Sequence, residues 1–236
     1  MDAPIAVATR SRLRFGARLG GARAYLAVSG GISVPAVLGS RATHLGSAMG
    51  GLDGRALKAG DRLPLGPRKR GRESFSTLPT GPAKKTPVPF SVPNRVARIR
   101  VLPGPHHERF AAAALDTLQS APYVVGHNSD RMGFRLQGPT LTHGSTSGAV
   151  DFISDATPLG SIQVPASGQP ILLMADRQTT GGYPILATVI TADIGLAGQL
   201  GPGDALSFVV CQRREAIAAL AAQDRALLAM QSEAAP

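Results

Sequence analysis

The sequence lacks tryptophan, holds a single cysteine and contains few aromatic side chains. Aromatic residues make up only 4% of its 236 residues, so Val, Ile, Leu and Ala must fill the core. Cys211 stands alone, which excludes an internal disulfide framework and fits a reducing compartment, with the cytoplasm as the default. No run of about 18 consecutive apolar residues occurs, and residues 1–15 are too rich in charge for a secretory signal. The sequence therefore predicts neither a membrane span nor export.

The net charge of +10 is concentrated in one segment. Between Gly66 and Arg98 there are eight Lys or Arg and one acid, Glu73, among several prolines. A basic, Pro-rich stretch is stiff and faces solvent, so residues 67–95 are predicted to be a connector. No aromatic side chain is interleaved with Arg68-Lys69-Arg70 to stack on bases, which argues against a nucleic-acid partner.

Two ordered blocks, residues 15–66 and 96–230, flank this connector. Short runs rich in branched residues and bounded by turns predict strands over 24–28, 96–101, 132–136, 162–164, 171–175, 187–191 and 205–210. Helices are predicted over 107–119 and 213–230, the second with apolar residues at helical spacing. Many short strands with few helices favour a barrel or sandwich over a parallel sheet.

Generic catalytic motifs are missing from the sequence. Residues 50–55 lack the Gly-Lys-Ser/Thr ending of a phosphate-binding loop, and no Gly-x-Ser-x-Gly elbow occurs. His106, His107 and Glu108 follow one another directly instead of standing one helical turn apart, which makes a poor zinc site. These three are predicted to be polar residues at a helix start, and no metal site is predicted.

Three polar clusters stand out by local density. Asp130 and Arg131 stand beside a glycine, and Gln163 is a lone polar residue in an apolar strand. The third cluster, residues 176–183, follows another apolar strand with Asp, two Thr, paired Gly and Tyr. Such a loop suits the binding of a small polar substrate. It equally suits a long hairpin whose Asp and Thr bond to their own backbone, and residue chemistry leaves both interpretations open.

These clusters carry a resemblance to a known family. Residues 160–165, 168–171 and 176–184 resemble the most characteristic stretch of the family of 5-oxoprolinase C subunits, also known as allophanate hydrolase subunit 2 or biotin-dependent carboxyltransferase. Residues 129–139 are similar to its other signature, and upstream matches follow in order at 23–28, 30–32, 35–41 and 57–61. The resemblance covers residues 13–210 apart from the basic connector.

The resemblance implies a mainly β fold made of cyclophilin-like β-barrel lobes, with a few short helices and a C-terminal helix. Family members usually begin with a Thr-Thr-Val-Gln-Asp-like block, which this sequence does not show. The first lobe is therefore expected to be incomplete. The expected domains are a partial first lobe over 1–66, the connector over 67–95 and a second lobe with the C-terminal helix over 96–236.

The resemblance also implies a function. The chain is expected to be a subunit of a hydrolase that opens 5-oxo-L-proline to L-glutamate with ATP, acting with A and B subunits. ATP is implied by the family alone. By the same resemblance, Arg131 is expected to bind the substrate carboxylate. Asp176 and Tyr183 are the candidates for proton transfer, with Gln163 and Thr179 orienting the lactam amide.

Two alternatives remain open at this stage. One is carboxyl transfer to a urea-like amide from a biotin that a partner protein carries, because the sequence has no Met-Lys biotinylation motif. The other is a binding subunit without catalysis that regulates a partner. All three functions would use a small polar ligand or a protein partner and none requires a membrane.

Overall fold

The computed structural model describes residues 8, 10–18, 20–67, 96–144 and 152–233. These residues divide into two compact units. One unit comprises residues 24–67, and the other comprises the residues up to 23 together with those from 96 onward. From position 68 onward the predicted connector lies outside the described residues, so its role stays a prediction.

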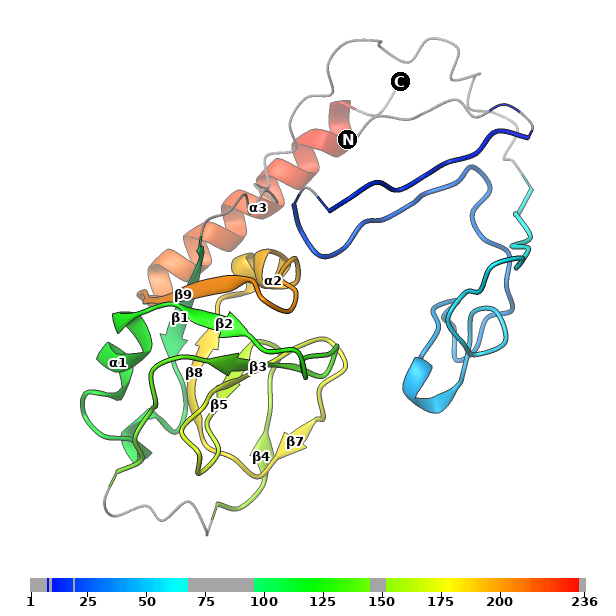
Figure 1. Cartoon of the computed structure of the whole chain (residues 1–236). Helices are drawn as coiled ribbons and strands as arrows, with labels where there is room; N and C mark the ends of the chain where they lie inside the picture. Colours follow the sequence, from blue (N-terminus) through cyan, green and yellow to red (C-terminus); the bar gives the residue numbers. More distant parts are fainter. Residues whose placement is uncertain (1–7, 9, 19, 68–95, 145–151, 234–236) are drawn as a thin grey trace. The chain divides into compact units, whose positions relative to one another are not determined.

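Seven strands of the described residues close into a barrel in the second unit (Figure 1). In spatial order they are β1 (Ala97–Pro103), β8 (Ile185–Val189), β5 (Ser161–Gln163), β6 (Ile171–Leu173), β3 (Gly133–Gln137), β2 (Tyr123–Val125) and β9 (Ala205–Val210). β9 completes the ring by pairing in parallel with β1, from Ala97 opposite Leu206 to Val101 opposite Val210. The predicted mainly β fold is confirmed, and closure gives each barrel strand two neighbours.

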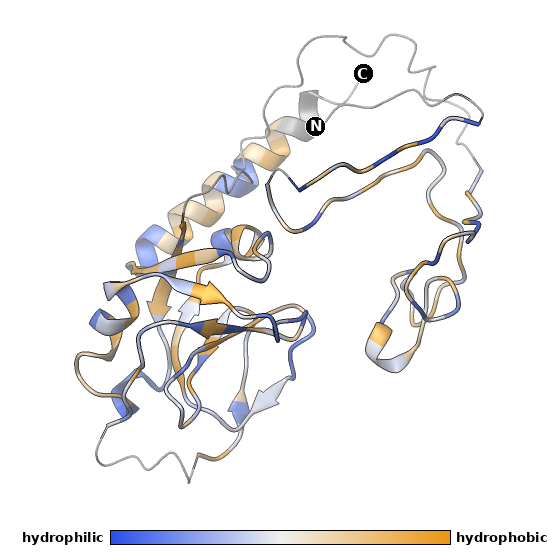
Figure 2. Ribbon diagram, in the orientation of Figure 1, coloured by the Kyte–Doolittle hydropathy of each residue, from blue (hydrophilic) through white to orange (hydrophobic). Residues whose placement is uncertain are grey.

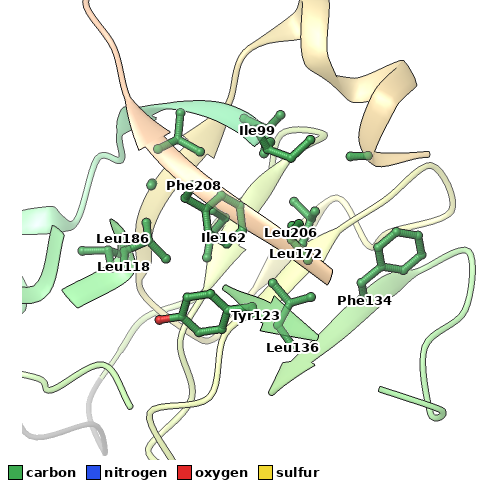
Figure 3. Packing of buried hydrophobic residues seen from close by; sticks show 14 of the residues in the cluster. Ile99, Leu118, Tyr123, Phe134, Leu136, Ile162, Leu172, Leu186, Leu206 and Phe208 are labelled. Atoms are coloured by element: carbon green, nitrogen blue, oxygen red, sulfur yellow. The ribbon is translucent and has the colours of Figure 1, made fainter. Parts of the chain in front are cut away.

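Alternation along the strands places apolar side chains inside the barrel. In β1, Ile99 is fully buried while the neighbouring Arg98 is exposed, as expected for a strand with one buried face. Phe208 of β9 and Tyr123 of β2 meet inside with ring centroids 5.8 Å apart, among branched side chains (Figure 3). Burial raises the pKa of Tyr123 to about 12. Its hydroxyl donates to the carbonyl oxygen of Pro139 at 2.9 Å, so this buried polar group is satisfied.

The helices of the second unit differ from the predicted ones in one place. They are η3 (His107–Arg109), α1 (Ala114–Ser120), α2 (Thr191–Ala197) and α3 (Arg213–Glu233). The single helix predicted over 107–119 is wrong, because Phe110 adopts extended backbone and is buried in the core. The predicted C-terminal helix is confirmed as α3, which extends from the barrel and alternates between apolar and hydrophilic turns (Figure 2). Among the described residues, no helix combines the length and apolar character that crossing a membrane requires.

An ion pair joins β1 to α2. The Arg100 guanidinium donates to both carboxylate oxygens of Asp193, at 3.0 and 2.7 Å, and the Arg100 backbone N–H adds a third bond at 2.8 Å. The side-chain hydrogen bonding to Asp193 raises the pKa of Arg100. Asp193 is only 7% exposed, whereas the Arg100 side chain is 41% exposed. The buried carboxylate therefore depends on Arg100 more than the guanidinium depends on it.

Replacing Asp193 with Asn is expected to lower the free energy of unfolding by about 1–3 kcal/mol. The charge-assisted hydrogen bonds to Arg100 weaken, and the amide nitrogen of the new Asn faces an N–H donor of Arg100. The cost stays below that of a fully buried pair because Arg100 can be hydrated. Urea denaturation followed by circular dichroism measures the change. Asp224→Asn, on the exposed surface of α3, is the matched control with an expected change within about 0.5 kcal/mol. Equal shifts for both variants would contradict the prediction.

The first unit, residues 24–67, contains turns and one short described helix, η1 (Leu45–Ser47). The strand predicted over 24–28 is wrong, since these residues pair with no described segment. A strand is stable only when its backbone groups find partners. Tyr25 and Leu38 are 89% and 93% exposed. The apolar residues of this unit thus do not gather into a core comparable with that of the barrel.

Polar contacts hold a turn at Lys58–Asp61 in this unit. Asp61 accepts hydrogen bonds from the Arg55 guanidinium at 2.8 and 2.9 Å and from the Lys58 backbone N–H at 2.7 Å. These hydrogen bonds lower the pKa of Asp61 well below its usual range, and those from Arg55 have the largest effect. The Asp61 carboxylate therefore stabilises this turn through its own hydrogen bonds.

Candidate functional site

A two-stranded ribbon lies at one end of the barrel (Figure 1). It consists of β4 (Asp155–Ala156) and β7 (Thr180–Gly181), with Asp155 opposite Gly181. Gly181 lies where several polar side chains converge. A methyl group on it would lie 2.6 Å from Gln163 Nε2 and 3.1 Å from Gln178 Nε2. The ribbon can approach these amides only because position 181 has no side chain.

Gln163 is the buried polar residue of this end of the barrel. It is 1% exposed, and its Nε2 donates to the backbone carbonyl oxygen of Tyr183 at 3.1 Å. Within the described residues, no hydrogen bond is formed by its Oε1. The pairing of β5 with β8 shifts register at this point, which places Gln163 opposite Ile185. Among the described residues only Arg23 Nη1 is a fully enclosed side-chain polar atom without a partner, so Gln163 Oε1 is not sealed off and can accept a hydrogen bond from a ligand.

Thr179 and Tyr183 lie in the same loop as the ribbon strand β7. The Thr179 carbonyl oxygen accepts from the backbone N–H of Thr157 at 2.9 Å, and the Thr179 side chain is exposed. Tyr183 is 46% exposed and holds Gln163 through its backbone carbonyl. The structure therefore gathers three of the predicted residues, Gln163, Thr179 and Tyr183, around β7.

Arg131 and Asp176, the other two predicted residues, bind each other. The guanidinium donates to both carboxylate oxygens at 2.7 and 2.9 Å, the fork-to-fork geometry that Arg favours. Backbone pairing supports the contact, since the Asp176 N–H donates to the Arg131 carbonyl oxygen at 2.9 Å. Their side chains are 64% and 26% exposed. The loop that runs from Asp176 to Thr179 connects this pair to the Gln163 cluster.

Two further polar residues at this end, His106 and Asp155, were not among the site residues predicted from the sequence. His106 Nε2 lies 3.1 Å from Asp155 Oδ2, and Nδ1 accepts from the Ile185 backbone N–H at 3.1 Å. The ring also meets the Phe152 ring edge-on, with centroids 4.7 Å apart. His106 precedes η3, as the predicted role at a helix start required. Its contacts lie 49 and 79 residues away along the chain, a separation that local pattern does not reveal.

Two further observations on the described part of the chain bear on the position of the site. There, no group of three or more His, Cys, Asp or Glu side chains is placed to hold a metal ion. A hollow of about 290 Å³ lies beside η3 and α1, lined by residues such as Glu108, Phe110 and Leu115. None of the five predicted residues lines it. Gln163, Thr179 and Tyr183 lie instead around β4 and β7, which is the candidate site, while Arg131 and Asp176 lie beyond the other end of β6, where Gly133 is opposite Leu173.

Comparison with known proteins places the chain in a family. The family model described as carboxyltransferase domain, subdomain A and B, matches residues 1–210. The chain is 41% identical over 208 residues to the 5-oxoprolinase C subunit of Escherichia coli K12, covering 87% of this chain and 61% of that protein. For the 5-oxoprolinase C subunit of Haemophilus influenzae the identity is 37% over 221 residues, with 91% and 66% covered.

Solved structures agree with this relationship. The crystal structure of the Kluyveromyces lactis urea carboxylase matches with a TM-score of 0.74 and 33% identity, over 87% of this chain and 19% of that one. The chain spans less than two thirds of the length of the two bacterial relatives. The match to the family nevertheless covers the barrel and all five predicted site residues. The chain belongs to the family of the carboxyltransferase domain, subdomain A and B.

Proposed function

We propose that the chain acts in the cytoplasm as the C subunit of an ATP-dependent 5-oxoprolinase. The reaction converts 5-oxo-L-proline, ATP and water to L-glutamate, ADP and phosphate, with A and B subunits as partners. The names of the bacterial relatives support this assignment. The observation that carries it is the buried Gln163 amide, whose Oε1 lacks a hydrogen-bond partner among the described residues. A lactam offers the N–H that this oxygen requires.

The Arg131–Asp176 pair supplies charge for the same substrate. 5-Oxoproline carries a carboxylate next to its lactam ring nitrogen. A guanidinium holds a carboxylate through two parallel hydrogen bonds. The substrate carboxylate competes with Asp176 for the Arg131 fork. Once displaced, the Asp176 carboxylate accepts a proton from the attacking water. Binding of the correct substrate thus prepares the residue that moves the proton.

Tyr183 and Thr179 complete the proposed site from the loop around β7. The exposed Tyr183 side chain is the second candidate for proton transfer, and the Thr179 hydroxyl orients the lactam. ATP activates the lactam oxygen, because an amide carbonyl is resonance-stabilised and phosphorylation turns its oxygen into a leaving group. No residue of this chain is assigned to ATP, which is a substrate of the whole complex.

Glutamate release from 5-oxoproline and ATP, by the chain mixed with its A and B subunits, tests the proposal. Gln163→Leu is expected to lower kcat/KM about tenfold, the loss of one buried hydrogen bond. Gln169→Leu is the matched control. Its amide bonds to the Gly138 backbone and to Thr140, so it reports the structural cost of the same change. Omission of each subunit in turn shows whether this chain is required. Equal effects of the two variants, or activity without the chain, would refute the assignment.

Carboxyl transfer to urea is the second candidate, favoured by the match to the urea carboxylase structure. In that case a biotin on a partner protein delivers the carboxyl group. Urea shares the amide that Gln163 recognises but has no carboxylate for Arg131. Arg131→Gln therefore separates the two functions. It raises KM for 5-oxoproline if the chain is an oxoprolinase subunit, and leaves the KM for urea unchanged in a carboxyltransferase.

A further inference from the structure

The hollow beside η3 and α1 has a buried apolar floor. Its volume is about 290 Å³. Three of the residues that line it, Phe110, Ala114 and Leu186, are 5%, 3% and 0% exposed. Further apolar side chains complete the lining, namely Ala111, Ala112 and Leu115. Ligand pockets in proteins begin at about 300 Å³, so this hollow has room for a small molecule with an apolar body.

Two exposed polar residues of η3, His107 and Glu108, line the same hollow. All other lining residues are apolar. A ligand that forms a polar contact with a side chain here must therefore use one of these two. A buried apolar floor with two exposed polar side chains suits a ligand that is apolar at one end and polar at the other.

The His107 ring has one nitrogen left for a ligand. Nδ1 lies 2.8 Å from the Gly104 carbonyl oxygen. Because a carbonyl oxygen can only accept, Nδ1 carries the proton in this hydrogen bond. The neutral ring then has its lone pair on Nε2. Within the described residues, Nε2 forms no hydrogen bond. His107 therefore offers a ligand a hydrogen-bond acceptor.

The Glu108 carboxylate is a second acceptor and brings a negative charge. It forms neither a hydrogen bond nor an ion pair with any other residue that the structure describes. The neighbouring cation, Arg109, does not line the hollow, and its guanidinium carbon lies 5.2 Å from the centroid of the Phe152 ring. Both polar side chains of the hollow thus accept hydrogen bonds, and one of them is negative. The matching ligand group donates hydrogen bonds and is positively charged.

We infer that the hollow beside η3 and α1 is a second ligand site, which takes a small alkylammonium compound. Glu108 and His107 Nε2 accept the N–H groups of the ammonium, and the apolar floor covers the carbon part. The inference goes beyond the proposed function, since none of the five residues assigned to that function lines the hollow. Binding to the full chain therefore tests it whether or not the complex releases glutamate.

Three compounds of the same shape and different charge test the ligand class: cyclohexylamine, cyclohexanol and cyclohexanecarboxylate. The full chain is labelled with ¹³C in its alanine methyl groups, because Ala111, Ala112 and Ala114 line the hollow. Cyclohexylamine is expected to shift these three NMR signals more than that of Ala113, which does not line it. Its Kd should be about threefold lower than that of cyclohexanol, the effect of one exposed charge pair. Cyclohexanecarboxylate should bind most weakly.

The comparison can fail in two ways. Equal Kd values for the amine and the alcohol would overturn the assignment of an ammonium ligand. No shift of the three alanine signals with any compound would overturn the site itself.

Glu108→Gln isolates the contribution of the charge. It keeps the shape of the side chain, and we expect the Kd for cyclohexylamine to rise about threefold while the Kd for cyclohexanol stays the same. Asp116→Asn is the matched control, because Asp116 is an exposed acid of α1 outside the lining of the hollow. Equal effects of these two variants on the amine would contradict the role of Glu108.

A pair of alanine variants tests the position of the site. Ala112→Leu places a larger side chain in the hollow and is expected to abolish binding of cyclohexylamine. Ala113→Leu adds the same atoms to the neighbouring residue, outside the lining, and should leave the Kd unchanged. An unchanged Tm shows that each variant is folded. If Ala112→Leu does not fold, the comparison of Glu108→Gln with Asp116→Asn decides the inference. Unchanged binding by folded Ala112→Leu overturns it.

Discussion

Phe208→Ala is expected to lower the free energy of unfolding by about 3–5 kcal/mol, the usual cost of removing a buried aromatic ring. Phe208 is 1% exposed in β9 and packs against Tyr123 inside the barrel. β9 pairs with both β1 and β2, so a cavity at this position loosens two strand pairs together. Urea denaturation followed by circular dichroism gives the value, since the chain has no tryptophan to serve as a fluorescent probe.

The control for this prediction is Leu227→Ala on α3. Leu227 is 46% exposed, so its truncation opens no enclosed cavity and should cost less than about 1 kcal/mol. The assignment of the core to the barrel interior would be wrong if the two variants lost equal stability. It would also be wrong if Phe208→Ala unfolded at the wild-type urea concentration.

Gly104→Ala is expected to affect stability and the candidate site together. A methyl group on Gly104 would lie 2.5 Å from the Ile185 carbonyl oxygen and 2.9 Å from the Ala187 nitrogen, both of them backbone atoms of β8. The turn or the strand must shift, at a cost of about 1–3 kcal/mol. The same shift is expected to pull His106 from Ile185. The turn that holds Gly104 is joined to β8 by a hydrogen bond from the Gly104 nitrogen to the Leu186 carbonyl oxygen, 2.8 Å away.

The measurement for Gly104→Ala combines Tm with KM for 5-oxoproline in the complex. Both are expected to change. Gly20→Ala is the matched control, because nothing lies within 4 Å of a methyl group there. A Gly104 variant with lowered Tm but unaltered KM would show that the turn moves without affecting the candidate site.

The barrel was largely predictable from the sequence, because its strands carry their own signal. The apolar run at 205–210 became β9, and the alternation of Arg98 with Ile99 became the two faces of β1. The strand predicted over 24–28 is wrong, and the reason cannot be read from composition. Its residues are strand-like, but the described chain offers them no neighbour. α2 was missed since it begins after Ile190 without a side-chain cap.

The candidate site was predictable in part. Gln163 stood out as the lone polar residue of the strand predicted over 162–164, and the structure buries it to 1% exposure. Arg131 and Asp176 were selected separately, yet 45 residues apart they form one ion pair. His106 was overlooked because its partners come from β8 and β4, and only the closed barrel brings them together. Long-range pairing of this kind follows from the register of strands and not from local motifs.

The parallel pairing of β1 with β9 has a consequence for synthesis of the chain. Val101 meets Val210, so the first barrel strand leaves the ribosome more than a hundred residues before its final neighbour. Until then β1 has an open edge, and contacts of such sequence separation form slowly. During that interval the nascent barrel exposes backbone and apolar surface that favour association with other chains or chaperones. Proper closure is thus a late event, completed only when residues 205–210 have emerged.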